Sequence, residues 1–84
     1  MEAALAVQEY LEYTIVQLIE HPESASVIHE EKEGGHLFLI RLHPDDTGRV
    51  IGKNGKTIKA IRSLAIASAQ KHGIRVDVEL EDDE

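Results

Sequence analysis

Hydrophobic side chains recur at spacings of three and four residues near the start of the chain. The positions concerned are Val7, Leu11, Ile15, Leu18 and Ile19. This spacing puts them on one face of an amphipathic helix. His21-Pro22 ends the pattern, because a residue that precedes proline disfavours helical backbone angles. We therefore predict a helix over residues 3–20.

The next two apolar segments predict a β-hairpin. Residues 25–32 indicate a short strand with apolar Val27 and Ile28. Residues 36–43 are apolar on both faces, which is typical of a central strand. Gly34-Gly35 between them is typical of a turn. We expect the two strands to pair antiparallel.

A short helix and a long helix are predicted after the hairpin. Pro44 ends the second strand, and the short helix covers residues 45–51. Asp45 or Asp46 can cap it, since acidic groups are favourable in the first turn of a helix. The long helix covers residues 56–72 and repeats apolar residues at helical spacing.

Glycine marks the end of both helices, at Gly52 and at Gly73. Residues 74–80 then alternate between apolar and charged side chains, the pattern of a half-buried strand. Because this strand returns through two helices, we expect it to lie parallel to the central strand.

These elements predict an α+β fold in the order α-β-β-α-α-β. A three-stranded mixed sheet would be covered on one face by three helices. We expect one domain over residues 1–80, followed by an acidic tail over residues 81–84.

Charge is distributed unevenly along the chain, whose net value is −7. Residues 1–44 carry −6, residues 45–75 carry +5 and residues 76–84 carry −6. The net value argues against nucleic acid as a partner, but a basic middle can still present one positive face.

Several classes of function are disfavoured by composition. The chain contains no cysteine, which excludes disulfides and thiolate chemistry. No two of its five histidines have helical i, i+4 spacing on a predicted helix, so we expect no bound metal or other cofactor. No cluster indicates catalysis, and we do not expect an enzyme. Without a signal peptide or a long apolar run, a cytoplasmic location is expected.

The loop between the two later helices, Gly52-Lys53-Asn54-Gly55, is the strongest candidate site. Its glycines let the chain turn sharply and remove the Cβ atoms that would block a close partner. The backbone N–H groups that begin the long helix carry the positive end of its dipole, which attracts phosphate. Lys53 and Lys56 add charge there, and Asn54 adds an amide donor.

The residues from Val50 to Ile61 fit the signature Val-Ile-Gly-x-x-Gly-x-x-Ile-x-x-Ile at every specified position. In this respect the chain resembles the KH family, in which such a loop clamps the backbone of single-stranded RNA. The element order is similar to the type II arrangement. The residues that we expect to bind RNA are Arg49, Val50, Ile51, Gly52, Lys53, Asn54, Gly55, Lys56, Ile58, Lys59 and Arg62.

The resemblance extends to small bacterial single-KH proteins of the KhpA type. It implies an RNA chaperone or post-transcriptional regulator acting in cell envelope synthesis, elongation and division. It also implies a homodimer or a complex with a KhpB (Jag)-type protein. A different reading is a protein–protein adaptor that uses the KH fold for dimerisation or partner docking.

Overall fold

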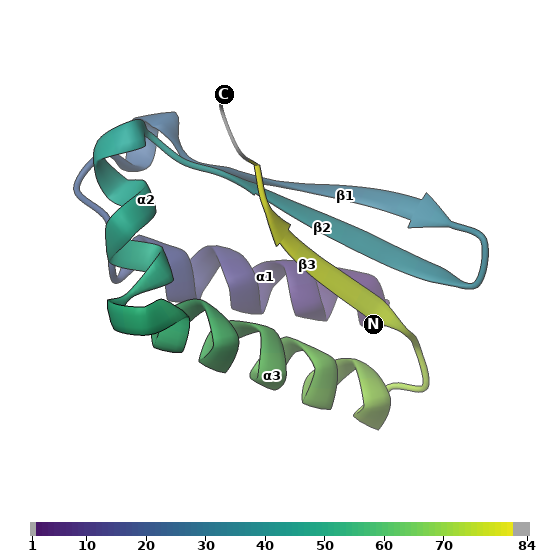
Figure 1. Cartoon of the computed structure of the whole chain (residues 1–84). Helices are drawn as coiled ribbons and strands as arrows, with labels where there is room; N and C mark the ends of the chain where they lie inside the picture. Colours follow the sequence, from purple (N-terminus) through teal and green to yellow (C-terminus); the bar gives the residue numbers. More distant parts are fainter. Residues whose placement is uncertain (1, 82–84) are drawn as a thin grey trace.

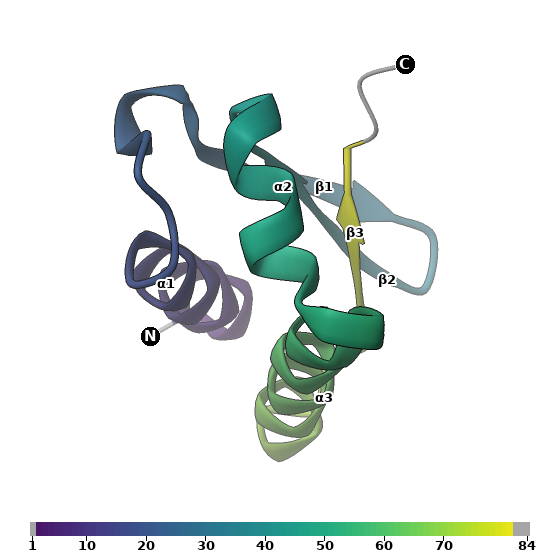
Figure 2. The same ribbon diagram turned by 60° about the vertical axis from the view of Figure 1, so that its left-hand side comes forward.

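The computed structural model describes residues 2–81 and arranges them as a sheet against helices (Figure 1). The predicted order α-β-β-α-α-β is confirmed, with two additional 3₁₀ turns. The elements are α1 (Ala3–Val16), η1 (Pro22–Ser24), β1 (Ser26–Lys32), β2 (Gly35–Arg41), α2 (Pro44–Ile51), η2 (Lys53–Gly55), α3 (Lys56–Lys71) and β3 (Val76–Leu80). Helices α1 and α3 run beneath the sheet, and α2 stands at one end of it (Figure 2).

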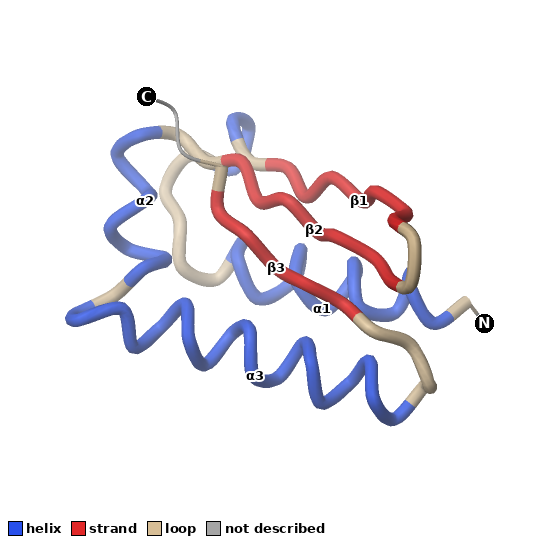
Figure 3. Tube along the Cα trace, turned by 45° about the vertical axis from the view of Figure 1, so that its right-hand side comes forward, coloured by secondary structure: helices blue, strands red, loops and turns tan. Residues whose placement is uncertain are grey.

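The sheet has the strand order β1-β2-β3, so the prediction of a central second strand is confirmed (Figure 3). Strands β1 and β2 pair antiparallel, and β2 and β3 pair parallel. The parallel arrangement follows from the connection, because α2 and α3 carry the chain back to the starting end of β2.

The hydrophobic core lies between the sheet and the helices. In β3, Val76 and Val78 are buried whereas Asp77 and Glu79 are exposed, which confirms the predicted alternation. Together with Val76 and Val78, the larger apolar residues of the core are Val7, Leu11, Ile15, Val27, Phe38, Ile40, Val50, Ile58 and Ile61. Except for Phe38 the core is aliphatic, so its stability rests on the burial of many branched side chains.

Helix α1 ends four residues earlier than predicted. The N–H groups of Gln17 and Leu18 bond to carbonyls only three residues back, which tightens the last turn and stops the helix. Leu18 and Ile19 still pack against the core, and this is why the apolar spacing continues past the helix. Within the described chain, no helix combines the length and apolar character needed to cross a bilayer.

The last strand begins at Val76, two residues later than predicted, and is followed by one more contact with β2. Arg75 precedes the strand, although its carbonyl accepts a 2.9 Å hydrogen bond from the N–H of His36. At the other end, Glu81 donates its N–H to the carbonyl of Ile40 and forms an ion pair with Arg41. Residues 82–84 of the predicted tail lie outside the described residues.

Candidate nucleic-acid interface

The imidazole of His43 caps helix α2, which leads directly into the candidate loop. His43 Nδ1 accepts a 3.0 Å hydrogen bond from the N–H of Asp45. The prediction that Asp45 or Asp46 caps the helix was therefore wrong. Both acids lie in the first turn instead, and Asp46 turns into the protein interior.

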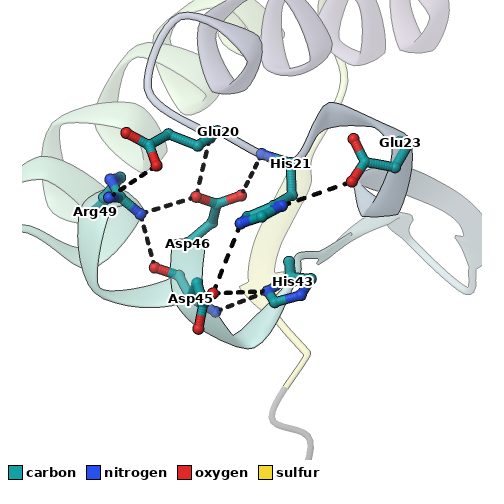
Figure 4. A network of polar contacts seen from close by, with 7 residues as sticks. All are labelled: Glu20, His21, Glu23, His43, Asp45, Asp46 and Arg49. Carbon is teal, nitrogen blue, oxygen red and sulfur yellow. Dashed lines mark hydrogen bonds and ion pairs between the residues drawn. The ribbon is translucent and has the colours of Figure 1, made fainter.

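Asp46 ties α2 to the segment that follows α1 (Figure 4). Its carboxylate is fully buried and accepts hydrogen bonds from the N–H groups of Glu20 at 3.0 Å and His21 at 2.9 Å. Arg49 donates a further bond of 3.1 Å. Burial alone would raise the pKa of Asp46, but the two backbone donors, with His21 and Arg49 nearby, outweigh burial and lower it. The beginning of α2 is thus fixed by an ionised carboxylate.

The loop itself has positive φ at three of its four residues. Gly52 has φ 77° and ψ 174°, a combination that is essentially restricted to glycine. Asn54 has φ 58° and Gly55 has φ 74°. A Cβ on Gly52 would lie 2.2 Å from Oγ1 of Thr57, whereas one on Gly55 would meet nothing within 4 Å. Gly52 therefore allows close packing inside the loop, and Gly55 leaves open space in front of it.

Helix α3 begins immediately behind the loop with its first turn accessible. Among the described residues, none caps it with a side chain, and its first turn contains no acid. Lys53, Asn54, Lys56 and Lys59 are all exposed around this helix end. None of the three lysines forms an ion pair within residues 2–81. The combination is a positive helix end with exposed lysines around it, which favours an anion such as phosphate.

The apolar residues predicted to support bases divide into two groups. Val50 is fully buried and Ile58 is 6% exposed, so both pack α2 against α3 from beneath the surface. Ile51 is half-buried and retains an accessible surface. Of the three, Ile51 is therefore the one that a ligand can reach in this structure.

The two predicted arginines are held by the protein itself. Arg49 contacts Glu20 at 3.3 Å as well as Asp46, and it donates to the carbonyl of Asp45. Arg62 is half-buried and donates from Nε to the carbonyl of Val78 at 2.9 Å, which links α3 to β3. Both arginines therefore position elements around the loop, and the lysines carry most of its unneutralised charge.

Sequence reasoning missed the positioning role of Asp46 and the close approach of Thr57 to Gly52. A signal for Asp46 existed, because it lies three residues before Arg49 in a short helix and such pairs meet on one face. No comparable signal existed for Thr57, whose contact with Gly52 depends on the exact path of the loop.

Replacing Gly52 by alanine should destabilise the protein far more than the same change at Gly55. The Gly52→Ala variant combines a clash with Thr57 and a glycine-only backbone conformation, together costing about 2–4 kcal/mol. Gly55→Ala meets no neighbour and should cost about 1 kcal/mol from its left-handed backbone alone. Urea unfolding of both variants measures the difference. Equal losses would contradict the proposed contact with Thr57.

The fold and the loop together define a type II KH domain: the order is α-β-β-α-α-β, and a Gly-x-x-Gly loop joins α2 to α3. The family model of the KhpA/KhpB KH domain matches residues 8–80. This chain belongs to that family.

Several curated relatives are RNA-binding proteins named KhpA. The one from Halalkalibacterium halodurans is 43% identical, covering 81% of this chain and 92% of its own length. The one from Chlamydia pneumoniae is 37% identical and covers 88% of this chain and 95% of its own. The Bacillus subtilis protein is 33% identical, with corresponding shares of 90% and 94%.

Among solved structures, Aquifex aeolicus Era bound to GDP and aluminium fluoride contains a similar fold. The TM-score is 0.66 at 20% sequence identity, and the match covers 99% of this chain and 33% of the Era chain. At this level of identity the likeness concerns the fold alone.

Proposed function

We propose that this protein binds single-stranded RNA and grips its backbone at the loop Gly52–Gly55. The observation that carries the proposal is the start of α3, which no side chain caps, behind a loop whose Gly55 faces open space. The family membership supports it, because the curated relatives are RNA-binding proteins. A KH loop of this kind clamps about four nucleotides.

In the proposed mechanism, both backbone N–H groups and side chains contact the RNA. N–H groups of the loop Gly52–Gly55 hold phosphate oxygens beside the positive end of α3, and Lys53 and Lys56 supply the charge that neutralises them. Lys59 extends the basic track along α3, toward the point where Arg62 joins β3. Ile51 offers apolar surface beside the loop, while Val50 and Ile58 support the two helices from the core. Aromatic stacking has no part in this mode, since no aromatic residue lies in or next to the loop sequence.

The proposal extends to the biological role that the family suggests. An RNA chaperone or post-transcriptional regulator, acting with a KhpB-type partner in cell envelope synthesis, elongation and division, is in keeping with a family model that spans both KhpA and KhpB. A homodimer is the simpler assembly in the same proposal.

The test is a titration of fluorescent single-stranded RNA with the untagged chain at several salt concentrations. Three or four phosphate contacts predict that log K falls against log salt with a slope of about −2 to −3. A duplex of the same sequence should bind at least ~10-fold more weakly, because its bases are not free to leave the stack. Equal binding of both forms, or no binding at about 50 mM salt, would refute single-stranded recognition.

A protein–protein adaptor is the second candidate, and the outer surface of α3 favours it. Leu64 is 60% exposed and Ile66 is 42% exposed, so α3 presents two large aliphatic side chains to solvent. An adaptor should retain its partner when the loop is altered, whereas RNA-dependent association should be lost.

A further inference from the structure

Strand β1 is an outer strand of the sheet, and alternate residues along it direct their backbone groups away from β2. The N–H of His36 bonds to the stretch before β3, and the carbonyl of Ile40 bonds to the stretch after it, so alternate residues of β2 point toward β3. Val27, His29 and Glu31 are the residues of β1 that pair with this set. In an antiparallel pair such residues point away from the partner strand, so their N–H and C=O groups face outward.

Gln8 of α1 covers one of these outward groups. Its side-chain amide donates a 3.2 Å hydrogen bond to the carbonyl of Val27. No loop or side chain of residues 2–81 bonds the corresponding backbone groups of His29 and Glu31. These two residues therefore form a free strand edge, to which an extended chain can pair.

An apolar pocket of about 90 Å³ lies at the start of the same edge. It lies between the end of α1 and the beginning of β1, and its lining includes Ile15, Val16, Ile19 and Val27. Val16 is 47% exposed, so part of this lining is open to solvent. The pocket is several times larger than the space one water needs, and its lining suits an aliphatic side chain. The strand from Val27 to Glu31 spans roughly 13 Å, so one short extended segment can reach both the pocket and the free edge.

The charge on this side of the molecule is acidic. Residues 2–31, which contain α1 and all but the last residue of β1, carry seven glutamates and no lysine or arginine. Glu9 and Glu12 on α1 and Glu30 and Glu31 on β1 are exposed, and Glu12 also lines the pocket. Lys32, the last residue of β1, is the first base along the chain. This charge attracts a basic segment, and it repels both RNA and anionic lipid.

We propose that β1 and α1 together dock an extended, basic segment of a partner protein. The segment adds to the sheet as a fourth strand, with its backbone bonded to His29 and Glu31 and one aliphatic side chain in the pocket. Its lysine or arginine side chains pair with the glutamates of α1 and β1. A second copy of β1 is a poor occupant, because it would bring two identical sets of acids together. This proposal does not depend on the RNA-binding proposal, whose loop joins α2 to α3.

A capped peptide of about seven residues that alternates lysine with valine is the probe, since it is long enough to span the edge. Titrated into the ¹⁵N-labelled, untagged chain, it should saturate at one peptide per chain. Binding should slow hydrogen exchange of the His29 and Glu31 amides at least ~10-fold, because both become bonded to the peptide. Saturation that leaves these two amides unprotected would overturn the proposal.

Two matched peptides separate the contributions of charge and apolar contact. Threonine in place of valine keeps the charge and the preference for an extended chain, whereas glutamate in place of lysine keeps the apolar residues. Each change should weaken binding at least ~10-fold. Binding of the threonine peptide as tight as that of the probe would exclude a role for the pocket.

Glu31→Pro tests the free edge without opening the hairpin. The N–H of Glu31 points away from β2, and proline is tolerated at such positions of an outer strand. This variant should lose at least ~10-fold in affinity for the probe, because one backbone donor is gone. Glu31→Gln is the control: it removes the charge but keeps the N–H, and it should lose no more than ~3-fold. Equal losses in the two variants would contradict strand addition.

Val16→Lys tests the pocket by placing a cation in its lining. It should weaken binding at least ~10-fold, while Gln17→Lys, which makes the same change in charge outside the lining, should lose no more than ~3-fold. Circular dichroism confirms that each variant remains folded. If Glu31→Pro fails to fold, Val16→Lys and its control decide the outcome, and equal losses in that pair would refute the site.

Other occupants of the edge give distinct results in the same exchange experiment. Protection of His29 and Glu31 that grows with protein concentration, without peptide, would show that a second copy pairs with β1. Protection caused by single-stranded RNA would show that nucleic acid binds there. Either result would replace the proposed protein partner and overturn the proposal.

Discussion

Changing Lys53 and Asn54 to aspartate together is expected to weaken binding of single-stranded RNA by roughly 100-fold. Both side chains are exposed at the tip of the loop, and the double change reverses its charge. Asp tolerates the left-handed conformation of Asn54, so the backbone is retained. The melting temperature should therefore move by less than about 2 °C. Fluorescence titration and thermal unfolding measure the two effects separately.

A charge-matched control is available at the far end of α3. Gln70→Asp with Lys71→Asp makes the same change in net charge at exposed positions, roughly 20 Å from the loop along α3. This control should lose no more than ~3-fold in affinity, as expected for a distant, screened charge. Equal losses in the two double variants would show that net charge, and not the loop, governs binding. Unchanged binding in the loop variant would exclude the proposed site.

Asp46→Asn should lower the melting temperature by roughly 10 °C at neutral pH. The substitution keeps the size of the side chain but replaces one acceptor oxygen by a donor NH₂. Two backbone N–H groups, from Glu20 and His21, converge on the carboxylate, so one donor would then face another. Arg49 would also lose its buried ionic partner. Thermal unfolding followed by circular dichroism measures the change.

The effect of Asp46→Asn should depend on pH in one direction. The pKa of Asp46 is lowered below its ordinary value of 3.8 in the folded protein. Its carboxylate therefore stabilises the fold above that value, and this contribution disappears as pH falls through the lower folded pKa. The gap in melting temperature between wild type and variant should be full at about pH 7 and should narrow below about pH 4.

Asp45→Asn is the matched control, because its carboxylate lies in the same helical turn but is exposed. The Asp45→Asn variant should change the melting temperature by less than about 2 °C. A gap for Asp46→Asn that stays constant from neutral to acid pH would contradict the assigned role of its charge.

Most of the fold could be predicted because periodicity reports burial directly. The alternation of Val76 and Val78 with acids marked a half-buried strand, and residues 36–43 indicated a central one. The predicted end of α1 was wrong because apolar residues outside the helix still pack in the core. Leu18 and Ile19 pack inward from a turn, and a pattern of hydrophobicity cannot distinguish that arrangement from another turn of helix.

The candidate loop could be located from its glycines, but the residues that hold it in place could not be predicted. The backbone around Gly52 and Gly55 follows from local sequence, since few residues adopt positive φ. Two of the partners of Asp46, the N–H groups of Glu20 and His21, are more than twenty residues away in sequence, and any residue type provides such backbone groups. Ile58 belongs to the apolar stripe of the long helix, but the burial of Val50 could not be predicted, because the same side chain suits a core or a binding surface.

The hydrogen bond from Arg62 to Val78 also bears on how the protein behaves at high concentration. Strand β3 is an outer strand of the sheet, and such strands offer unpaired backbone groups to any extended chain that comes near. The guanidinium of Arg62 donates a hydrogen bond to one of these groups, the carbonyl of Val78. The exposed acidic side chains of Asp77 and Glu79 repel a second copy of the same strand. Arg62, Asp77 and Glu79 thus disfavour pairing of β3 with a strand of another molecule, which is a common first step in aggregation.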